Sequence, residues 1–196
     1  MKILFLDFDG VITTYDSKWK IDLNKLALLD KIIEQTNAKI VVTSSWKYGS
    51  KDVEHFKERI YTRLHTTDIY DETPFGKFID QIYDITDGCG YRGDEVEKYL
   101  NEHSGDIESY VILDDENDFK EEQLFNFVQT DTYEGLTERE VKLCISILNN
   151  IKVVNPIRLN LELITMWRNN CNGLDKNNIS TLLDKYYNNF RQKYEI

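Results

Sequence analysis

The segment LFLDFDGVI, residues 4–12, places two carboxylates one residue apart at the end of an apolar run. Only Phe8 separates Asp7 from Asp9, and Gly10 follows at once. Side chains alternate along an extended strand, so we expect both carboxylates to point the same way while Phe8 points into the core. Two like charges held this close repel each other, and a bound cation relieves that repulsion. The pair is therefore suited to metal-assisted chemistry on an anionic substrate.

The same spacing suits covalent catalysis of phosphoryl transfer. One carboxylate can attack a phosphorus atom held in line, while its neighbour gives a proton to the leaving group and then activates water. Gly10 would let the backbone turn sharply away beneath the phosphate. Taken alone, a pair of acids at a strand end is as often a turn or an adventitious cation site. The catalytic interpretation depends on what the other strands bring to the same edge.

Two other apolar runs also end in polar side chains. Thr43, Ser44 and Ser45 end the segment AKIVVTSS, and Asp114 and Asp115 end the segment SYVILDD. The carboxyl ends of parallel strands meet at one edge of an open α/β sheet, and ligands bind there. The four carboxylates expected at this edge require a compensating cation. We expect Mg²⁺, because it commonly takes one or two carboxylates together with substrate phosphate.

Short apolar runs alternate with segments of helical periodicity through most of the chain. Continuous runs rich in Val, Ile and Leu are typical of strands buried on both faces, and they predict strands at 2–8, 38–45, 109–115 and 125–131. Helical spacing predicts helices at 22–36, 51–64, 93–103 and 137–150. The alternation of the two patterns predicts an α/β fold with a doubly wound parallel sheet.

Two of these helices carry start signals. Asp22 is a suitable N-cap for the first, and Thr137 with Glu140 forms a capping box at the last. Residues 66–91 show no clear periodicity and hold Gly and Pro, so we expect them to be irregular.

The C-terminal residues 151–196 differ in character from the domain expected at 1–150. Apolar residues at helical spacing predict a helical hairpin, with a turn at 169–178. We expect this extension to pack on the domain, on a second copy of the chain in a homo-oligomer, or on a partner protein. The alternative is a nucleic-acid-binding arm, with basic residues set among tyrosines at Lys185, Arg191 and Lys193.

Composition sets limits on location and partners. The chain has 196 residues and a net charge of −11, made up of −14 on residues 1–150 and +3 on residues 151–196. So acidic a domain is a poor general binder of nucleic acid backbone, where affinity comes largely from neutralising phosphates. No apolar stretch approaches the ~20 residues of a membrane helix, and the N-terminus is expected to be a buried strand, not a signal peptide. Three widely spaced cysteines, with no CxxC pair, favour a reducing, cytoplasmic location.

At these motifs the chain resembles the haloacid dehalogenase (HAD) superfamily of phosphatases. LFLDFDGVI is similar to the first motif of that superfamily, IVVTSSW to the second and YVILDDENDF to the fourth, while YRGDEVEKYL supplies the basic residue of the third. The resemblance implies a HAD-like, Rossmann-like fold and an Mg²⁺-dependent phosphatase that forms an aspartyl-phosphate. It implies Asp7 as nucleophile and Asp9 as general acid and base. It also implies a metal site formed by Asp7, Asp9 and Asp114, with Asp115 and Asp118 close behind.

The resemblance also implies which residues hold the phosphoryl group. Gly10 and Ser44 are expected to contact it, and Arg92 is expected to supply the cation. Alternation allows either Ser44 alone or its neighbours Thr43 and Ser45 to face the phosphate, and we favour Ser44 because it stands two residues before Trp46, as in relatives with a following Trp. Lys98 and Lys47 are alternatives to Arg92. The three histidines, His55, His65 and His103, lack partners at ligand spacing and are expected to lie on the surface.

A closer resemblance is to the HAD domain of Swiss Army knife RNA repair proteins, which implies a phosphatase acting on phosphorylated RNA or DNA ends. The runner-up is a small-molecule nucleotidase or sugar phosphatase of the same superfamily. Outside enzymes, the alternatives are a catalytically inactive relative or a receiver-like binding domain. Receiver domains end their first strand with adjacent acids and carry the phosphorylated Asp midway along the chain, so the order of the acids here disfavours them.

The spacing of the motifs bears on substrate size. Small-molecule phosphatases of the superfamily usually carry a cap domain after the first or second motif. Residues 9–43 and 45–92 leave no room for a separately folded cap, which predicts a capless or minimally capped, open site. Near its mouth we expect contacts from the loop residues Tyr15, Lys18, Trp19 and Lys20 and from Lys47. Trp46 is expected to pack in the core or to stack on a base.

Overall fold

The computed structural model describes residues 1–65, 74–88 and 90–151, with the side chains of residues 63–65 and 74 left out. The chain divides into two units, Met1–Ile151 and Lys152–Ile196, and the first of them is described below. The predicted helical hairpin and its basic residues lie outside the described residues and stay a prediction.

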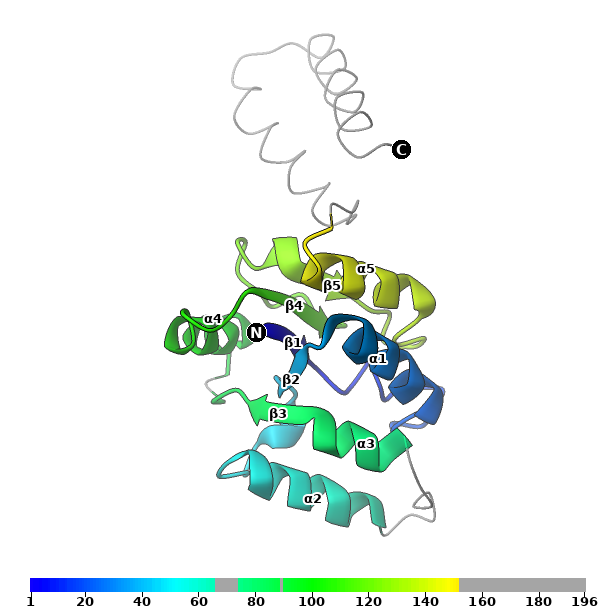
Figure 1. Cartoon of the computed structure of the whole chain (residues 1–196). Helices are drawn as coiled ribbons and strands as arrows, with labels where there is room; N and C mark the ends of the chain where they lie inside the picture. The colour runs from blue at the N-terminus through cyan, green and yellow to red at the C-terminus, as the bar shows by residue number, and fades with distance from the viewer. Residues whose placement is uncertain (66–73, 89, 152–196) are drawn as a thin grey trace, which may run out of the picture. The chain divides into compact units, whose positions relative to one another are not determined.

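The described residues build a five-stranded parallel sheet with the strand order β3-β2-β1-β4-β5 (Figure 1). The strands are β1 (Lys2–Leu6), β2 (Lys39–Val42), β3 (Ile82–Ile85), β4 (Ser109–Asp114) and β5 (Phe127–Gln129). The strand at the centre of the sheet is therefore β1, which is followed directly by Asp7, Phe8 and Asp9 (the DxD segment). This arrangement confirms the predicted doubly wound α/β fold.

Helices cover both faces of the sheet. They are α1 (Leu23–Thr36), α2 (Val53–His65), α3 (Pro74–Gln81), α4 (Arg92–Glu102) and α5 (Glu138–Leu148), with short 3₁₀ turns η1 (Ser45–Lys47) and η2 (Leu124–Asn126). Figure 1 shows α1, α3 and α5 on one side of the sheet and α4 on the other. The predicted caps are both present: Asp22 accepts a hydrogen bond from the Asn24 amide, and Thr137 and Glu140 form the capping box of α5.

The expectation that residues 66–91 are irregular is wrong for 74–85, which form α3 and β3. Pro74 suggested a loop in the sequence. Proline also fits the first turn of a helix, however, because its missing N–H has no partner there to lose. Phe75, Phe78 and Ile79 are the buried face of this short helix. The strand that follows is a four-residue sheet edge whose exposed Tyr83 and half-buried Asp84 break the apolar run. Such a short, mixed strand gives too little periodicity to be recognised in sequence.

Side chains of β1 alternate between the two faces of the sheet. Leu4 and Leu6 belong to the core cluster shared with α1 and α5, while Phe5 points to the other side and meets the Tyr99 ring of α4 at 5.6 Å. Asp7 follows the end of β1, and its ion pair with Arg92 places its carboxylate on the side of α4. Phe8 is fully buried, as predicted, among the rings of Trp46, Phe56 and Phe78.

The connections between strands are short in the described part of the chain. A single helix, α1, joins β1 to β2, and η1, α2 and α3 lie between β2 and β3. Neither connection contains a separate domain among the described residues, so the carboxyl edge of the sheet has no cap there.

The described residues contain no helix that combines the length and the apolar character needed to span a bilayer.

Candidate active site

Asp7 is the first residue after β1 and is almost fully buried. Its backbone N–H donates to the Leu113 carbonyl, which fixes the loop against β4. Carboxylate oxygen Oδ2 lies 3.0 Å from Arg92 Nη1, whereas Oδ1 is buried without a hydrogen-bond partner among the described residues. Burial raises the pKa of Asp7, and the Arg92 charge and the Ser44 hydroxyl oppose that rise. The free oxygen is thus a carboxylate atom poised for a ligand or a reaction.

Two further carboxylates lie beside Asp7. Asp114 ends β4 and is fully buried, and Asp115 is the next residue. One ligand atom from each of the three residues falls within 4.8 Å of the other two. Burial, and then the charge of Asp7, raise the pKa of Asp114 to about 8, although Arg92 opposes this. Three of the four carboxylates predicted to gather at the strand ends therefore lie together, and the third member is Asp115.

This group of carboxylates fits a divalent cation. The donors are all hard carboxylate oxygens. Asp7 also has an oxygen, Oδ1, that is buried and unpaired in the described part of the structure. Mg²⁺ prefers such oxygen donors together with water and substrate phosphate. Asp118 is not part of this group of three. Its Oδ1 is also buried without a partner in the described residues, and its carbonyl accepts from the Gly93 amide at the start of α4.

The side chain of Asp9 lies outside that group of three acids. Its Oδ1 is 2.8 Å from Thr13 Oγ1, and its Oδ2 accepts a 2.9 Å hydrogen bond from Trp46 Nε1. Residues 7–9 follow the end of β1, so strand alternation does not govern the direction of Asp9. The geometry gives no support to Asp9 as a side-chain metal ligand. It leaves Asp9 half-buried and held in one orientation, which suits a group that transfers protons.

We predict that Trp46→Phe lowers kcat/KM about 2- to 10-fold, the effect of losing one hydrogen bond that orients Asp9. Phe keeps a ring against Phe8, 5.4 Å from the Trp46 ring, and removes only the N–H donor. The loss should vanish when the substitution is made in an Asp9→Asn background, because the two residues act as one unit. Equal losses in both backgrounds would show that Trp46 does not act through Asp9.

Gly10 has no side chain, and this leaves room for the Asp115 carboxylate beside it. Its φ is +71°, and a Cβ at this position would lie 2.2 Å from the Cγ of Asp115. Its N–H donates to the Thr13 carbonyl at 2.7 Å, and its carbonyl accepts from Thr130 Oγ1 at 2.8 Å. The expected phosphate contact of Gly10 therefore has no free amide to supply it in this structure. The residue allows the Asp115 carboxylate to approach the DxD turn.

The hydroxyls after β2 separate into distinct environments. Ser44 is fully buried, and its hydroxyl lowers the pKa of Asp7 by hydrogen bonding. Thr43 is also buried, with an Oγ1 that lacks a partner in the described residues. Ser45 is exposed and opens η1. The Ser44 hydroxyl is thus the one that acts on the Asp7 carboxyl, and its expected phosphate contact stays a prediction.

Arg92 is the cation beside the acids. As the first residue of α4 it forms ion pairs with both Asp7 and Asp114, and these charges raise its pKa further although burial opposes them. Lys98 is exposed and pairs with Asp87 on the loop after β3. The geometry therefore favours Arg92 over Lys98 as the residue that contacts phosphate.

Lys47 is also excluded from that role, and the expectation that it contacts substrate at the mouth is wrong. Its side chain is only 2% exposed and forms a 2.8 Å ion pair with Glu95 of α4. The ammonium also donates to the Thr43 carbonyl, while Thr86 donates to the same Glu95 oxygen. Lys47 therefore holds the loop after β2 against α4, and so fixes Ser44 beside Asp7.

We predict that Lys47→Met lowers the free energy of unfolding by about 3–5 kcal/mol, because it leaves the buried Glu95 charge without its ammonium partner. Urea denaturation of the Lys47→Met/Glu95→Gln double variant is the matched control, since that variant has no orphaned charge. The double variant should be more stable than the single one. A single variant as stable as the wild type would contradict a buried, charged pair.

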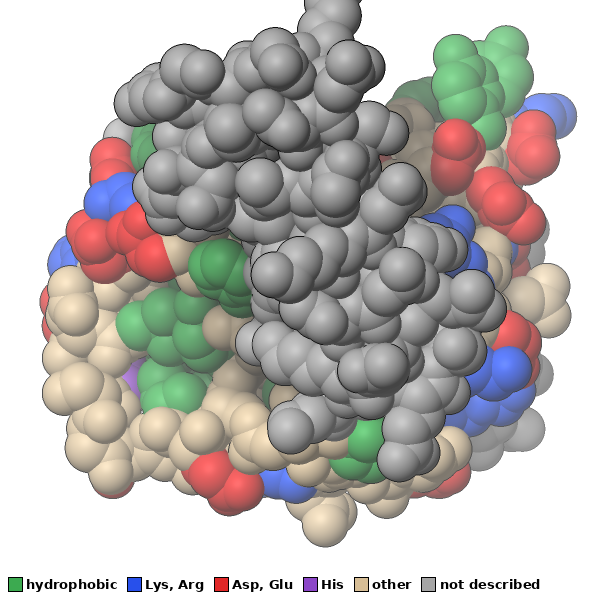
Figure 2. Space-filling model, turned by 90° about the horizontal axis from the view of Figure 1, so that it is seen from above, with side chains coloured by type: hydrophobic (Ala, Val, Ile, Leu, Met, Phe, Trp, Pro, Cys, Tyr) green, Lys and Arg blue, Asp and Glu red, His purple; other side chains and the backbone are tan. Residues whose placement is uncertain are grey.

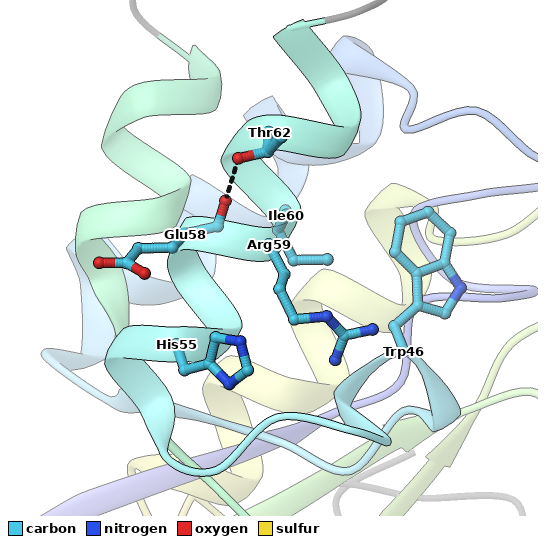
Figure 3. A pocket seen from close by; sticks show the side chains of 6 residues that line it. All are labelled: Trp46, His55, Glu58, Arg59, Ile60 and Thr62. Carbon is cyan, nitrogen blue, oxygen red and sulfur yellow. Dashed lines mark hydrogen bonds between the residues drawn. The ribbon is translucent and has the colours of Figure 1, made fainter.

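The hollow beside Trp46 is not lined by any of the three acids of the group. This hollow of about 420 Å³ between η1 and α2 is lined by Trp46, His55, Glu58, Arg59, Ile60 and Thr62 (Figure 3). Arg59 in this hollow donates to the Tyr48 carbonyl and the Ser50 hydroxyl, and His55 Nδ1 accepts from the Lys51 amide. His103 stacks on Tyr99, and the side chain of His65 lies outside the described residues. None of the described histidines enters the acidic group.

The sheet order, with an acidic group, a hydroxyl and an arginine at its carboxyl edge, defines a HAD-like α/β domain. A family model described as the HAD domain in Swiss Army Knife RNA repair proteins matches residues 3–141. The chain belongs to this family, which suggests a phosphatase-type function related to RNA repair. No curated protein and no solved structure matches the chain.

Proposed function

We propose that the protein is an Mg²⁺-dependent phosphomonoesterase that acts on phosphorylated nucleic acid ends through an aspartyl-phosphate at Asp7. The observation that carries the proposal is the state of Asp7. Its Oδ1 is buried and unpaired in the described structure, its Oδ2 is held by Arg92, and two more carboxylates lie within metal-binding distance. A nucleophile needs this combination of fixed orientation and a free attacking atom.

Each residue has a distinct role in this mechanism. Asp7 Oδ1 attacks phosphorus, the bond from phosphorus to the leaving-group oxygen breaks, and that oxygen takes a proton from the carboxylic acid of Asp9. Asp9, now a carboxylate, takes a proton from water as the water attacks the phosphorus, which releases inorganic phosphate and regenerates Asp7. Arg92 and Ser44 stabilise the charge on the phosphoryl oxygens.

The metal would be held by Asp7, Asp114 and Asp115, with Asp118 behind them. When bound, Mg²⁺ neutralises the charge on the phosphoryl oxygens and offsets the repulsion among the carboxylates. The acids themselves fix where it binds, because β1 and β4 are adjacent strands and Leu6 pairs with Leu113 one residue before Asp7 and Asp114.

Two observations support a macromolecular substrate. The described residues place no cap over the carboxyl edge, so the end of a long chain can reach Asp7 without closure of a lid. The family is described from RNA repair proteins.

Figure 2 shows Asp and Glu side chains at several points on one face of the molecule, with Lys and Arg between them. Such a surface favours binding through a few contacts near the terminal phosphate over neutralisation of a long backbone.

A substrate panel tests the proposal. Phosphate release should be measured from 3′- and 5′-phosphorylated oligonucleotides, nucleoside monophosphates and sugar phosphates, each with Mg²⁺ and with EDTA, at low salt. The proposal predicts that an oligonucleotide gives the highest kcat/KM and that EDTA abolishes it. A higher kcat/KM for a mononucleotide or a sugar phosphate would favour the small-molecule alternative.

A further inference from the structure

Two exposed tyrosines meet on the loops beside the acidic group. Tyr15, in the loop after β1, is 61% exposed, and Tyr133, in the loop after β5, is 65% exposed. Their ring centroids lie 5.6 Å apart at an interplanar angle of 60°. An exposed aromatic pair of this kind has lost little of its contact with water, so packing in the core does not explain it.

Both tyrosines are presented by ordered turns. The amides of Tyr133 and Glu134 donate to Asp131 Oδ1, and the Gly135 amide donates to the Asp131 carbonyl. On the other loop, Thr14 and Ser17 exchange hydrogen bonds between their side chains and backbones around Tyr15. Rings held in this way lose little conformational freedom when a ligand binds to them.

The two loops are fastened to each other. The Leu136 amide donates to the Val11 carbonyl, and a Cβ on Gly135 would come within 2.7 Å of Val11 O and 2.6 Å of Thr14 Cγ2. Gly135 has a φ of +70°, so the turn and the close approach both require glycine. The loop that carries Tyr133 is therefore joined to the loop that carries Tyr15, a few residues after Asp7 and Asp9.

The loop that carries Tyr133 is tied directly to the predicted metal ligands. Thr132, the residue before Tyr133, donates from Oγ1 to Asp115 Oδ2 at 2.6 Å, and Thr130 donates to the Gly10 carbonyl. Tyr133 is thus the next residue in the chain after Thr132, which hydrogen-bonds a member of the acidic group, and both tyrosine rings are exposed to solvent. The base of a nucleotide whose phosphate lies at the acidic group would therefore have this loop beside it.

We propose that Tyr15 and Tyr133 form a stacking platform for the base of the terminal nucleotide of a single-stranded, phosphorylated nucleic acid; this inference rests on the proposed function. A nucleobase fits because it is flat, and because stacking needs no basic surface on a domain that carries −14. Asp16, Asp131 and Glu134 flank the rings as exposed charges, so the apolar area suits one planar group better than a protein interface. On the same loop, the exposed Lys18 and Lys20 are available to the phosphates of the following nucleotides.

The test compares oligonucleotides that differ only in one base. Single-stranded oligonucleotides with a 3′- or 5′-phosphate, carrying either a normal or an abasic terminal nucleotide, are titrated against the full chain in EDTA, and binding is followed by fluorescence anisotropy. For the wild type, loss of the base should weaken binding about 5- to 150-fold, the range found for stacking of one base on one aromatic residue. In Tyr133→Leu the difference between the two ligands should fall to about twofold or less, as expected when one partner of an interacting pair has already been removed.

Two further variants serve as controls. Tyr133→Phe keeps the ring and should keep the preference for the normal base. Tyr83→Leu removes an exposed tyrosine from the edge strand β3 and should also keep it. Equal binding of both ligands to the wild type, or a full preference retained in Tyr133→Leu, would overturn the platform. Release of phosphate with Mg²⁺ tests the proposed function separately, because the base preference is measured without turnover.

Discussion

Replacement of Asp7 with Asn should lower the turnover of every phosphomonoester by about 10⁴-fold or more, as is typical when a covalent nucleophile is removed. The amide cannot attack phosphorus, and it also removes the negative charge that Asp7 brings to the acidic group. The measurement is phosphate release under saturating substrate and Mg²⁺. Retention of more than about a tenth of the wild-type activity would rule out Asp7 as the nucleophile, because no other group takes over such a role so efficiently.

The fold should survive this substitution. Burial raises the pKa of Asp7, so its charged form at neutral pH costs the folded state free energy. Asn has almost the same shape without the charge, and Arg92 keeps its ion pair with Asp114. The thermal midpoint of Asp7→Asn in EDTA should therefore equal or exceed that of the wild type. A lower midpoint would mean that lost activity reflects damage to the fold.

Asp9→Asn should lower kcat by about 10²–10⁴-fold, the usual contribution of a general acid and base. Asn can still occupy the place between Thr13 and Trp46, but it cannot give a proton to the leaving group. The loss should depend on the leaving group. In single-turnover phosphorylation of the enzyme, p-nitrophenyl phosphate should be affected less than an alkyl phosphate, because nitrophenolate departs without a proton.

Equal losses for the two substrates would argue against Asp9 as the proton donor. The Trp46→Phe variant is the matched control, since it keeps the Asp9 carboxyl and alters only its orientation. Its smaller loss should follow the same order of substrates as that of Asp9→Asn.

The central features of the fold and of the site could be predicted because local sequence determines them. Apolar runs that end in Asp7 and Asp114 identify two strands, and parallel pairing then brings the two acids to one edge. The helix caps at Asp22 and Thr137 are local interactions of the same kind. Arg92 could be placed only by resemblance to the third motif, because its spacing along the chain does not indicate a contact with Asp7.

Contacts that depend on tertiary packing could not be predicted. Lys47 looked like a surface cation, yet β3 and α4 enclose it with Thr86 and Glu95, more than 35 residues away in the chain. Strand alternation misplaced the Asp9 side chain because β1 ends before it. Thr13 and Thr132, which hold Asp9 and Asp115, were missed. The position of Thr13, a polar residue directly after the apolar Val11 and Ile12, could have pointed to a role at the site. Nothing in the sequence around Thr132 points to one.

The most direct test of the account is to trap the covalent intermediate. The Asp9→Asn variant should be mixed with p-nitrophenyl phosphate and Mg²⁺ in a single turnover, because this substrate needs no proton to leave and the variant should hydrolyse the intermediate slowly. The sample is then quenched with acid and reduced with borohydride, which converts an acyl phosphate of aspartate to homoserine. Peptide mass spectrometry should then find homoserine in place of Asp7. The label should be absent without substrate and should disappear again once the intermediate has been hydrolysed. Phosphate release from the substrate with Asp7 unmodified at every quench time, and another residue labelled instead, would contradict an aspartyl-phosphate at Asp7.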